Sequence, residues 1–247
     1  MDSLYIIIPA YNEAENIAST IEEWYDVIEN HNGNGESRLV IIDDGSTDYT
    51  FDIIEKAKES RPLLETISKE NGGHGSSIYQ GYLYALEKGA DYIFQTDSDG
   101  QTLASEFEQF YSLREEYNVQ IGDRINRADG IVRKLISFGV RIAVLFTFGV
   151  MVKDVNTPYR LMDNKSLKKA IGYLPENYNI TNVALTGIFG CMAKDKKYGS
   201  ELIRMRFVPI TFRTRQGGNN SINPVKIIKI GMHAFKELRE IRLNLGK

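Results

Sequence analysis

Two carboxylates and an amide stand at alternate positions directly after an apolar run. Asp97, Asp99 and Gln101 belong to the segment QTDSDGQ, which follows ADYIF. In an extended chain alternate side chains point the same way, so these three would converge on one volume. Carboxylate and amide oxygens suit Mg²⁺ or Mn²⁺, which keep several waters and share their coordination sphere with substrate phosphates. The spacing therefore predicts a site for one of these metals.

Two other interpretations of this segment compete with a magnesium or manganese site. A solvated turn, in which Asp97 caps the next helix, would be a strong competitor if the segment stood alone. A calcium-binding helical hand matches the spacing of Asp97, Asp99 and Glu108. It fails because Thr102 occupies the position that needs glycine and because a strand, not a helix, precedes the loop.

Polar and glycine residues also follow each of the three earlier apolar runs: Tyr11, Asn12 and Glu13, then Asp43 and Asp44, then Asn71 to Gly75. A tyrosine ring can stack on a base, carboxylates can accept from base N–H groups and ribose hydroxyls, and glycines let a ligand approach the backbone. A dinucleotide fingerprint is a poor match, because Ile78 replaces its third glycine and the loop follows a later strand than the first.

The apolar runs lack the alternation of half-exposed strands, and helical patterns separate them. Strands are predicted within residues 4–9, 37–43, 63–68 and 90–95, and helices over residues 13–29, 49–60 and 76–89. This order predicts an α/β fold with a mostly parallel sheet and helices on both faces, in which ligands bind beyond the carboxyl ends of the strands. A later helix, broken or bent near Gly139, is expected in the second half.

The charge of the chain is divided between its two halves. Residues 1–121 carry 7 Lys and Arg against 24 Asp and Glu, a net charge of −17, and residues 122–247 carry 23 against 9, a net charge of +14. This asymmetry suggests one pole that uses cations and one that faces anions. The lone Cys191 excludes an internal disulfide, no signal peptide is evident, and the longest apolar stretch, Ile142 to Val152, is too short to span a bilayer. We expect a cytoplasmic chain, peripheral on the inner face of the cell membrane, with no nucleic-acid partner.

The motifs PAYNE, VIIDDGSTD, ENGGHGSSIYQG and QTDSDGQ, in this order, resemble those of the family-two inverting glycosyltransferases of the GT-A fold. The resemblance implies a Rossmann-like domain that binds a nucleotide-diphosphate sugar, with UDP favoured over GDP by the family background. It implies donor contacts at these residues: Pro9, Ala10, Tyr11, Glu13, Asp43, Asp44, Asn71, Gly73, Asp97 and Ser98. Asp99 would bind the Mg²⁺ or Mn²⁺ that neutralises the departing diphosphate.

The segment YNITNVALTGIFG narrows the choice of acceptor. Many family members place a Glu-Asp pair at the start of a helix here, and its aspartate deprotonates a sugar hydroxyl. This sequence has no carboxylate from Asn177 to Met192. A phosphate monoester is already anionic at neutral pH and needs no base, so the absence favours a phosphate acceptor.

Further motifs resemble the dolichyl-phosphate and bacterial polyprenyl-phosphate glycosyltransferase branch of the family. DSDGQ resembles its DADLQ-type metal motif, GDR at 122–124 its GSR, RKLIS at 133–137 its basic helix start, and DVNTPYRLM at 154–162 its D-x-x-S-G-F-R segment. The sequence departs from this pattern at Asp123 and at residues 157–159. The resemblance implies that Gln101 also reaches the metal. It implies that the lipid phosphate is engaged by Arg124, Arg133, Ser137, Arg160 and, more weakly, Arg215.

We predict one GT-A-like domain over residues 1–222, followed by an amphipathic C-terminal helix at 223–247. Within the domain, residues 1–121 form the nucleotide-sugar half and residues 122–222 the acceptor half. The tail helix and residues 131–148 combine apolar faces with lysine and arginine, which suits the interface of an anionic leaflet. Packing on the core, or a dimer contact, is the alternative for both.

The predicted activity is metal-dependent transfer of a sugar, with inversion, from a nucleotide diphosphate to a polyprenyl phosphate of undecaprenyl or dolichyl type. Asp99, Arg124 and Arg133 are the predicted catalytic residues. Two alternatives stay open. Transfer to a hydroxyl of a lipid-linked or cell-surface saccharide would need a base, such as Asp154 or Asp163 brought close by folding. A catalytically inactive nucleotide-binding regulatory protein would keep the donor pocket without turnover.

Overall fold

The computed structural model describes most of the chain, in these ranges: 2–33, 35–125, 131–175, 178–198, 201–213 and 224–245. Residues 131–136 and 224–234 are described by their backbone alone. The predicted acceptor residue Arg215 and the side chain of Arg133 therefore lie outside the description. No helix in the described part is long and apolar enough to cross a membrane.

The elements of the fold alternate between strands and helices through the first half and less regularly through the second. In chain order they are β1 (Leu4–Ala10), α1 (Ile17–Asn30), β2 (Arg38–Asp43), α2 (Thr50–Lys58), β3 (Leu64–Ser68), α3 (His74–Glu87), β4 (Tyr92–Gln95), η1 (Ala104–Glu106), α4 (Glu108–Tyr111), β5 (Val119–Ile125), α5 (Ile131–Phe148), β6 (Arg160–Asp163), α6 (Asn164–Ile171), α7 (Thr181–Lys194), η2 (Lys196–Tyr198), β7 (Met205–Thr211) and α8 (Pro224–Leu245).

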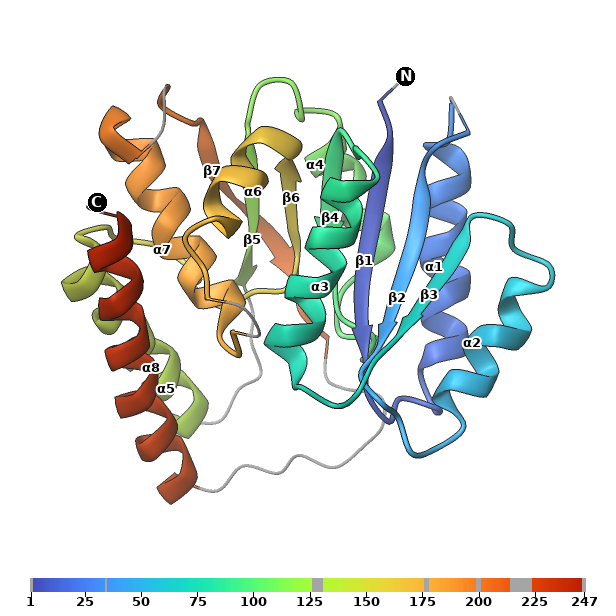
Figure 1. Cartoon of the computed structure of the whole chain (residues 1–247), viewed down its shortest axis with the longest axis horizontal. Coiled ribbons are helices and arrows are strands. Elements are labelled where there is room, and N and C mark those ends of the chain that lie inside the picture. Colours follow the sequence, from blue (N-terminus) through green and yellow to red (C-terminus); the bar gives the residue numbers. More distant parts are fainter. Residues whose placement is uncertain are drawn as a thin grey trace.

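The strands form one sheet in the order β3-β2-β1-β4-β6-β5-β7. β6 runs antiparallel to both of its neighbours, and every other neighbouring pair is parallel. Gln95 pairs with Arg160 and Tyr92 with Asp163, so β6 starts at the edge where β4 ends. The carboxyl ends of the parallel strands meet along that edge, the lower one in Figure 1. The predicted α/β fold with a mostly parallel sheet is confirmed.

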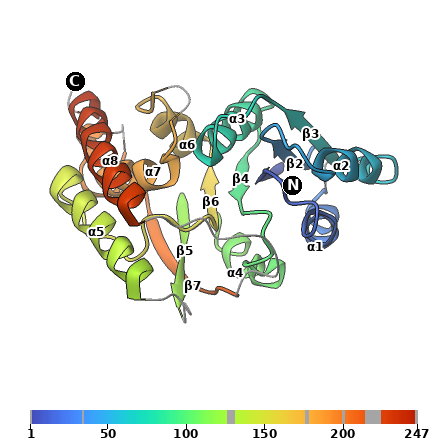
Figure 2. The same cartoon turned by 90° about the horizontal axis from the view of Figure 1, so that it is seen from below.

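Helices cover both faces of the sheet, with α1 and α4 on one face and α3, α6 and α7 on the other (Figure 2). β1 is buried along its whole length, and its side chains alternate between two apolar clusters. Ile6 and Ile8 belong to the cluster of Trp24 on α1, whereas Tyr5 and Ile7 belong to the cluster on the α3 side. A strand buried on both faces needs apolar residues at every position, which explains why the sequence shows no alternation there.

The C-terminal helix α8 packs along α5 (Figures 1 and 2). Its side chains Leu238, Ile241 and Leu245 are buried in the same apolar cluster as Val144 of α5. The predicted C-terminal helix is therefore present, and these three of its described side chains pack on the core, which was one of the alternatives for it. α5 continues through Gly139 without a break.

Candidate active site

A cavity of about 490 Å³ opens at the carboxyl edge of β1 and β4. Its lining comes from the segments that follow the strands: Pro9, Ala10, Tyr11, Glu13, Asp44, Asn71, Gly73, His74, Ser77, Asp97, Ser98 and Asp99. Nine of the ten predicted donor contacts are in this set. Asp43 is the exception, because its carboxylate accepts hydrogen bonds from the Ser46 amide at 3.3 Å and the Ser68 hydroxyl at 3.2 Å.

Asp44 organises the glycine loop that precedes α3. Its carboxylate is almost fully buried and accepts hydrogen bonds from the amides of Gly72 at 3.0 Å and Gly73 at 2.8 Å and from the ammonium group of Lys69. Burial opposes ionisation, but these hydrogen bonds outweigh it and hold the pKa of Asp44 below its ordinary value. Gly73 has a φ of +87°, in the left-handed region that favours glycine. Asp44 therefore acts as an anion that fixes the loop.

The start of α3 packs directly on the segment before α7. A Cβ atom added at Gly75 would lie 2.3 Å from the carbonyl oxygen of Asn179 and 2.4 Å from that of Tyr178. The hydroxyl of Thr181 donates to the carbonyl oxygen of Gly75 at 3.0 Å. The loop that carries Gly73 into the cavity is thereby held against the first turn of α7.

Asn12 ties the first two polar loops together, a role that its sequence motif alone does not reveal. Its backbone amide donates to Ser46 Oγ at 3.0 Å, and its side-chain oxygen accepts from the amide of Thr47 at 2.8 Å. Its φ of +53° is the only positive value outside glycine in the described part of the chain. Asparagine tolerates this conformation better than most residues, so the presence of asparagine at position 12 was the one sequence signal for a left-handed backbone there.

His74 and Ser77 contribute to the cavity from the first turns of α3. His74 Nε2 lies 2.8 Å from Asp97 Oδ1. Desolvation opposes protonation of the imidazole, but the charge and hydrogen bond of Asp97, with the charge of Asp99, outweigh it and raise the pKa of His74 above its ordinary value. Ser77 was not predicted. Its place near the start of a helix that follows a glycine loop, where anions bind, was the signal that could have found it.

The chain bends after β4 instead of staying extended to Gln101. Gly100 has a φ of +67° in this bend, and Asp99 Oδ1 accepts from the amide of Gln101 at 3.1 Å. The expectation of an extended segment is wrong, although Asp97 and Asp99 both line the cavity. Gln101 Nε2 donates to the carbonyl oxygen of Arg213 at 2.8 Å and joins this loop to the segment after β7.

The oxygen atoms of this loop fit a divalent metal that arrives with its substrate. Asp97 and Asp99 offer carboxylates at the cavity, and Gln101 follows them with an amide oxygen. In the described ranges, no group of three or more His, Cys, Asp or Glu residues could hold a metal by itself. Mg²⁺ and Mn²⁺ need only one or two carboxylates when substrate phosphates supply other ligands. The residues therefore match a metal–diphosphate complex.

Arg124 lies near the end of β5, on the same edge of the sheet as the cavity. Its Nε and Nη2 atoms donate to the two carboxylate oxygens of Asp154 at 2.7 and 2.9 Å, and its guanidinium lies 5.0 Å from the ring centre of Phe212. Both side chains of this ion pair are 8% exposed. Arginine uses the same two-pronged geometry to bind phosphate.

Arg160 is fully buried at the start of β6. It donates to the carbonyl oxygen of Thr157 through Nε at 3.2 Å and Nη2 at 2.6 Å, and to that of Asn182 through Nη1 at 3.2 Å. Burial lowers the pKa of Arg160 below its ordinary value. Arg124 and Arg160 therefore hold one loop, between α5 and β6, at Asp154 and Thr157. Neither arginine lines the donor cavity.

The remaining predicted acceptor residue within the description is Ser137, which is half-buried in α5. Asp163, one of the two possible bases, lies at the end of the sheet opposite the cavity. It caps α6, where its carboxylate accepts from the amide of Ser166 at 2.6 Å, and it also accepts from Asn118 Nδ2 at 2.6 Å. The structure thus separates Asp163 from the polar edge of the sheet.

Residues 5–193 match the family model described as glycosyl transferase family 2. The chain belongs to glycosyl transferase family 2. It is therefore a glycosyltransferase, as the four motifs predicted.

This glycosyltransferase has distant relatives in the branch that its motifs resemble. It is 26% identical over 267 residues to a UDP-N-acetylglucosamine-dolichyl-phosphate N-acetylglucosaminyltransferase of Methanococcus voltae, with 99% of this chain and 97% of that protein covered. It is 25% identical over 160 residues to an undecaprenyl-phosphate mannosyltransferase of Micrococcus luteus, with 62% of this chain and 63% of that protein covered.

The fold of the glycosyltransferase is also that of a solved structure. It superposes on glucosyl-3-phosphoglycerate synthase from Mycobacterium tuberculosis, in complex with Mn²⁺ and uridine-diphosphate-glucose, with a TM-score of 0.66 and 16% identity. The likeness covers 97% of this chain and 79% of that one. The predicted GT-A fold is confirmed.

Proposed function

We propose that this glycosyltransferase transfers a sugar, with inversion, from a UDP-sugar to a polyprenyl phosphate in a metal-dependent reaction. The observation that carries the choice of acceptor is the position of the carboxylates on the acceptor side. Residues 178–192, around the start of α7, include none. Arg124 holds both oxygens of Asp154, and Asp163 caps α6 at the far end of the sheet. Neither is placed as a base for a sugar hydroxyl, and a phosphate acceptor needs none.

The names of similar proteins support the same substrate classes. The Methanococcus voltae relative is named for UDP-N-acetylglucosamine and dolichyl phosphate, and the Micrococcus luteus relative for undecaprenyl phosphate. The structural neighbour is in complex with Mn²⁺ and uridine-diphosphate-glucose. These names favour uridine over guanosine in the donor and a lipid phosphate as acceptor.

In the proposed complex the donor lies in the cavity. Tyr11, which is exposed at its rim, stacks on the base, while Glu13 and Asn71 face the ribose. Asp99 and Gln101 hold Mg²⁺ or Mn²⁺, which when bound supplies the positive charge that stabilises the departing diphosphate. Pro9, Ala10, Asp44, Gly73, Asp97 and Ser98 also line the donor cavity, and Asp43 supports it from the loop after β2.

The proposed chemistry is a single displacement. An oxygen of the lipid phosphate attacks the anomeric carbon from the face opposite the diphosphate, and UDP leaves with the electrons of the broken bond. Inversion follows, and no proton has to be removed. Arg124 and Arg133 orient the anion with Ser137 and Arg215, while the buried Arg160 acts by holding the Thr157 loop.

The acceptor also determines where the enzyme works. A polyprenyl phosphate is dissolved in a membrane, so we propose that the enzyme meets this acceptor at a membrane surface. We place the enzyme peripherally on the cytoplasmic face, with residues 1–121 as the donor half and residues 122–222 as the acceptor half.

A comparison of acceptors tests this function. Purified protein with Mn²⁺ and labelled UDP- or GDP-sugars is given a short-chain prenyl phosphate, the free prenol, or a prenyl-diphosphate-linked saccharide. We expect label only in the prenyl phosphate, and from a UDP donor. Label in the saccharide would favour the hydroxyl acceptor, and donor binding without turnover of any acceptor would favour the regulatory alternative.

Arg124→Lys supplies the matching variant, because it keeps a positive charge beside Asp154 but loses the planar guanidinium group with which we propose that Arg124 also meets the acceptor phosphate. We expect the KM for prenyl phosphate to rise by about tenfold or more, since a charge-assisted hydrogen bond contributes about 1.5–3 kcal/mol. Arg204→Lys, an exposed arginine next to the opposite end of β7, is the control and should leave the KM unchanged.

A further inference from the structure

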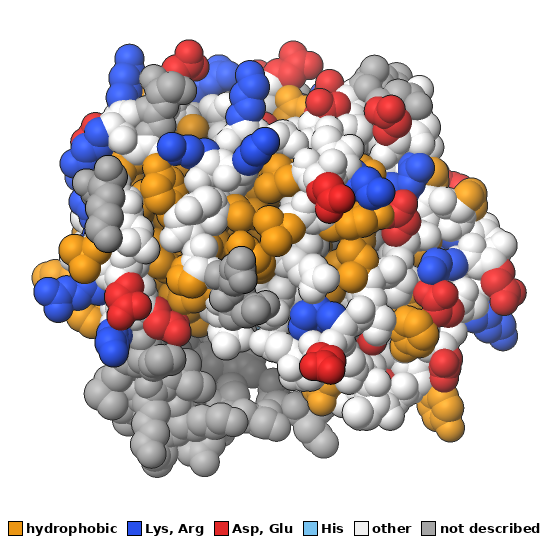
Figure 3. All heavy atoms as spheres, viewed as in Figure 1, with side chains coloured by type: hydrophobic (Ala, Val, Ile, Leu, Met, Phe, Trp, Pro, Cys, Tyr) orange, Lys and Arg blue, Asp and Glu red, His pale blue; other side chains and the backbone are white. Residues whose placement is uncertain are grey.

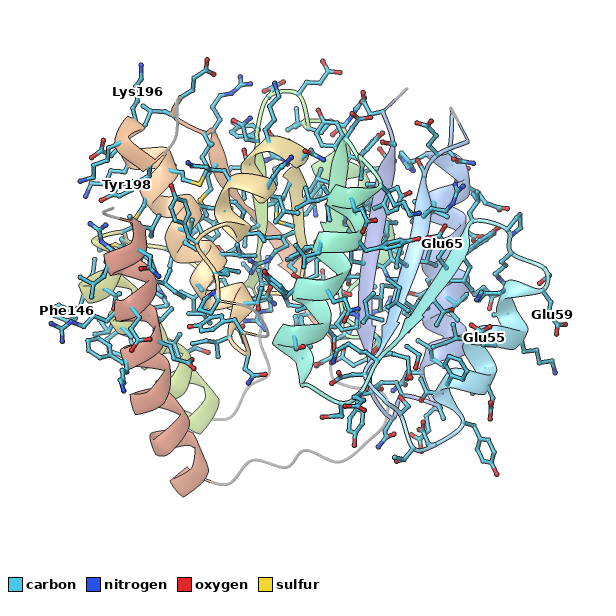
Figure 4. All side chains as sticks on the ribbon, in the orientation of Figure 1. Glu55, Glu59, Glu65, Phe146, Lys196 and Tyr198 are labelled. Carbon is cyan, nitrogen blue, oxygen red and sulfur yellow. The ribbon has the colours of Figure 1, made fainter. Side chains whose placement is uncertain are left out.

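The outer side of α5 exposes large apolar side chains. Phe138 and Phe146 are 61% and 78% exposed, and Met151, just beyond the helix, is 81% exposed. Val144, on the other side of α5, is buried in the core. The described part of α5 is therefore apolar on two sides, one packed on the core and the other exposed. Phe146 points away from the body of the molecule (Figure 4).

α8 continues this exposed apolar surface, but not with the apolar side chains that its sequence pattern places on one face. Two of those side chains, Leu238 and Ile241, are buried in the core. Phe235 and Leu243 are exposed, at a spacing of eight residues that places them on one side of the helix. The apolar stripe of the tail is thus divided between the core and solvent.

Basic residues outnumber acidic ones on the described parts of the segments that carry these exposed apolar side chains. On α5, α8, the end of α7 and the segments that adjoin them, the exposed basic residues in the described part are Arg141, Lys153, Lys194, Lys196, Lys197, Lys236 and Arg239. Acidic residues are fewer in the described part of these segments: Glu240 is exposed, Glu237 is half-buried, and Asp195, whose side chain is 45% exposed, pairs with Lys197. Figure 3 shows basic and hydrophobic side chains next to one another at the left of the molecule, with a few acidic ones among them, where Figure 1 places α5 and α8.

We propose that the outer side of α5 and α8, with Met151, is the surface by which the enzyme binds an anionic membrane. Aromatic and aliphatic side chains enter the interface while lysine and arginine meet lipid phosphates. A second copy of the chain fits less well, because a two-fold dimer would bring the same basic surface against itself. Both helices start at the edge of the sheet that carries the donor cavity (Figure 1), so the bound membrane lies beside the site. The link to catalysis rests on the proposed function, whereas membrane binding itself does not.

Vesicle flotation tests the surface. Unmodified protein is mixed with vesicles of phosphatidylcholine alone or of equal parts phosphatidylcholine and phosphatidylglycerol. We expect binding to the anionic vesicles, weakened by salt, and a loss of about tenfold in affinity for each of Phe146→Ser and Met151→Ser, because each removes one inserted apolar side chain. Tyr49→Ser and Leu83→Ser, exposed in the acidic half, are the controls and should bind as the unmodified protein does.

Three outcomes would contradict the proposed membrane-binding surface. The first is an equal loss of vesicle affinity in the control variants, and the second is equal binding to neutral and anionic vesicles. The third is a Phe146-dependent dimer, seen by light scattering, without vesicle binding. Transfer to a water-soluble short-chain prenyl phosphate separates this proposal from the proposed function. Phe146→Ser should leave that transfer unchanged, and vesicle binding without any such transfer would contradict the proposed function alone.

Discussion

Gly75→Ala should loosen the contact that holds the donor loop. The added Cβ would lie 2.3 Å from the carbonyl oxygen of Asn179, whereas uncompressed contacts of this kind are more than 3 Å long, so the two backbones must separate by about 1 Å. Overpacking of this kind costs about 1–3 kcal/mol. For a chain of this size we expect a fall in Tm of about 4–8 °C for 2 kcal/mol. Because Gly73 and His74 line the cavity just before this point, UDP affinity should fall as well.

Gly139→Ala is the matched control for this prediction. Gly139 is also helical, but a Cβ added there has nothing within 4 Å, so alanine should stabilise the protein by about 0.5–1 kcal/mol. Urea unfolding followed by circular dichroism gives the stabilities, and thermal shift with UDP and Mn²⁺ gives donor binding. If Gly75→Ala were as stable as the unmodified protein and bound UDP equally well, the proposed junction between α3 and α7 would be refuted.

Three further changes test other contacts. The lowered pKa of Asp44 gives stability that is present above the unfolded pKa and lost as pH falls through the folded one, so Lys69→Met should move that loss to higher pH in urea unfolding; an unchanged acid profile would contradict it. Asp99→Asn should abolish the Mn²⁺-dependent part of the UDP thermal shift while ligand-free unfolding changes by less than about 0.5 kcal/mol, and a retained Mn²⁺ effect would remove Asp99 from the metal site. Asp163→Ala should lower the free energy of unfolding by about 1 kcal/mol through loss of the α6 cap but leave the rate of transfer unchanged; a slower rate at full stability would restore Asp163 as a base.

The donor side was predictable because its information is local. Each polar motif directly follows an apolar strand, and parallel strands bring their carboxyl ends to one edge. Tyr11, Asp44 and Asp97 therefore meet in one cavity although they are far apart in the sequence. The mostly parallel sheet followed from the same fact, since strands buried on both faces have no polar alternation.

The acceptor side was less predictable because its contacts are made between distant segments. Nothing in the local pattern indicates that β6 inserts antiparallel between β4 and β5, or that this buries Arg160. Arg124 and Asp154 are 30 residues apart, and their pairing depends on the strand order. The ion pair between Asp44 and Lys69 was equally unpredictable on the donor side. The position of Asp44 in its motif indicates a contact with the ligand, but it does not indicate that Lys69 already pairs with the carboxylate.

Identifying the bond that the enzyme makes to the anomeric carbon of the sugar tests the central proposal most directly. The enzyme is supplied with Mn²⁺, an α-linked UDP-sugar and a short-chain prenyl phosphate, and the product is examined by proton and phosphorus NMR. We expect a sugar joined through its anomeric carbon to the prenyl phosphate, with β configuration, together with free UDP. A product linked to a hydroxyl, a product with α configuration, or release of UDP with free sugar alone would contradict the proposal.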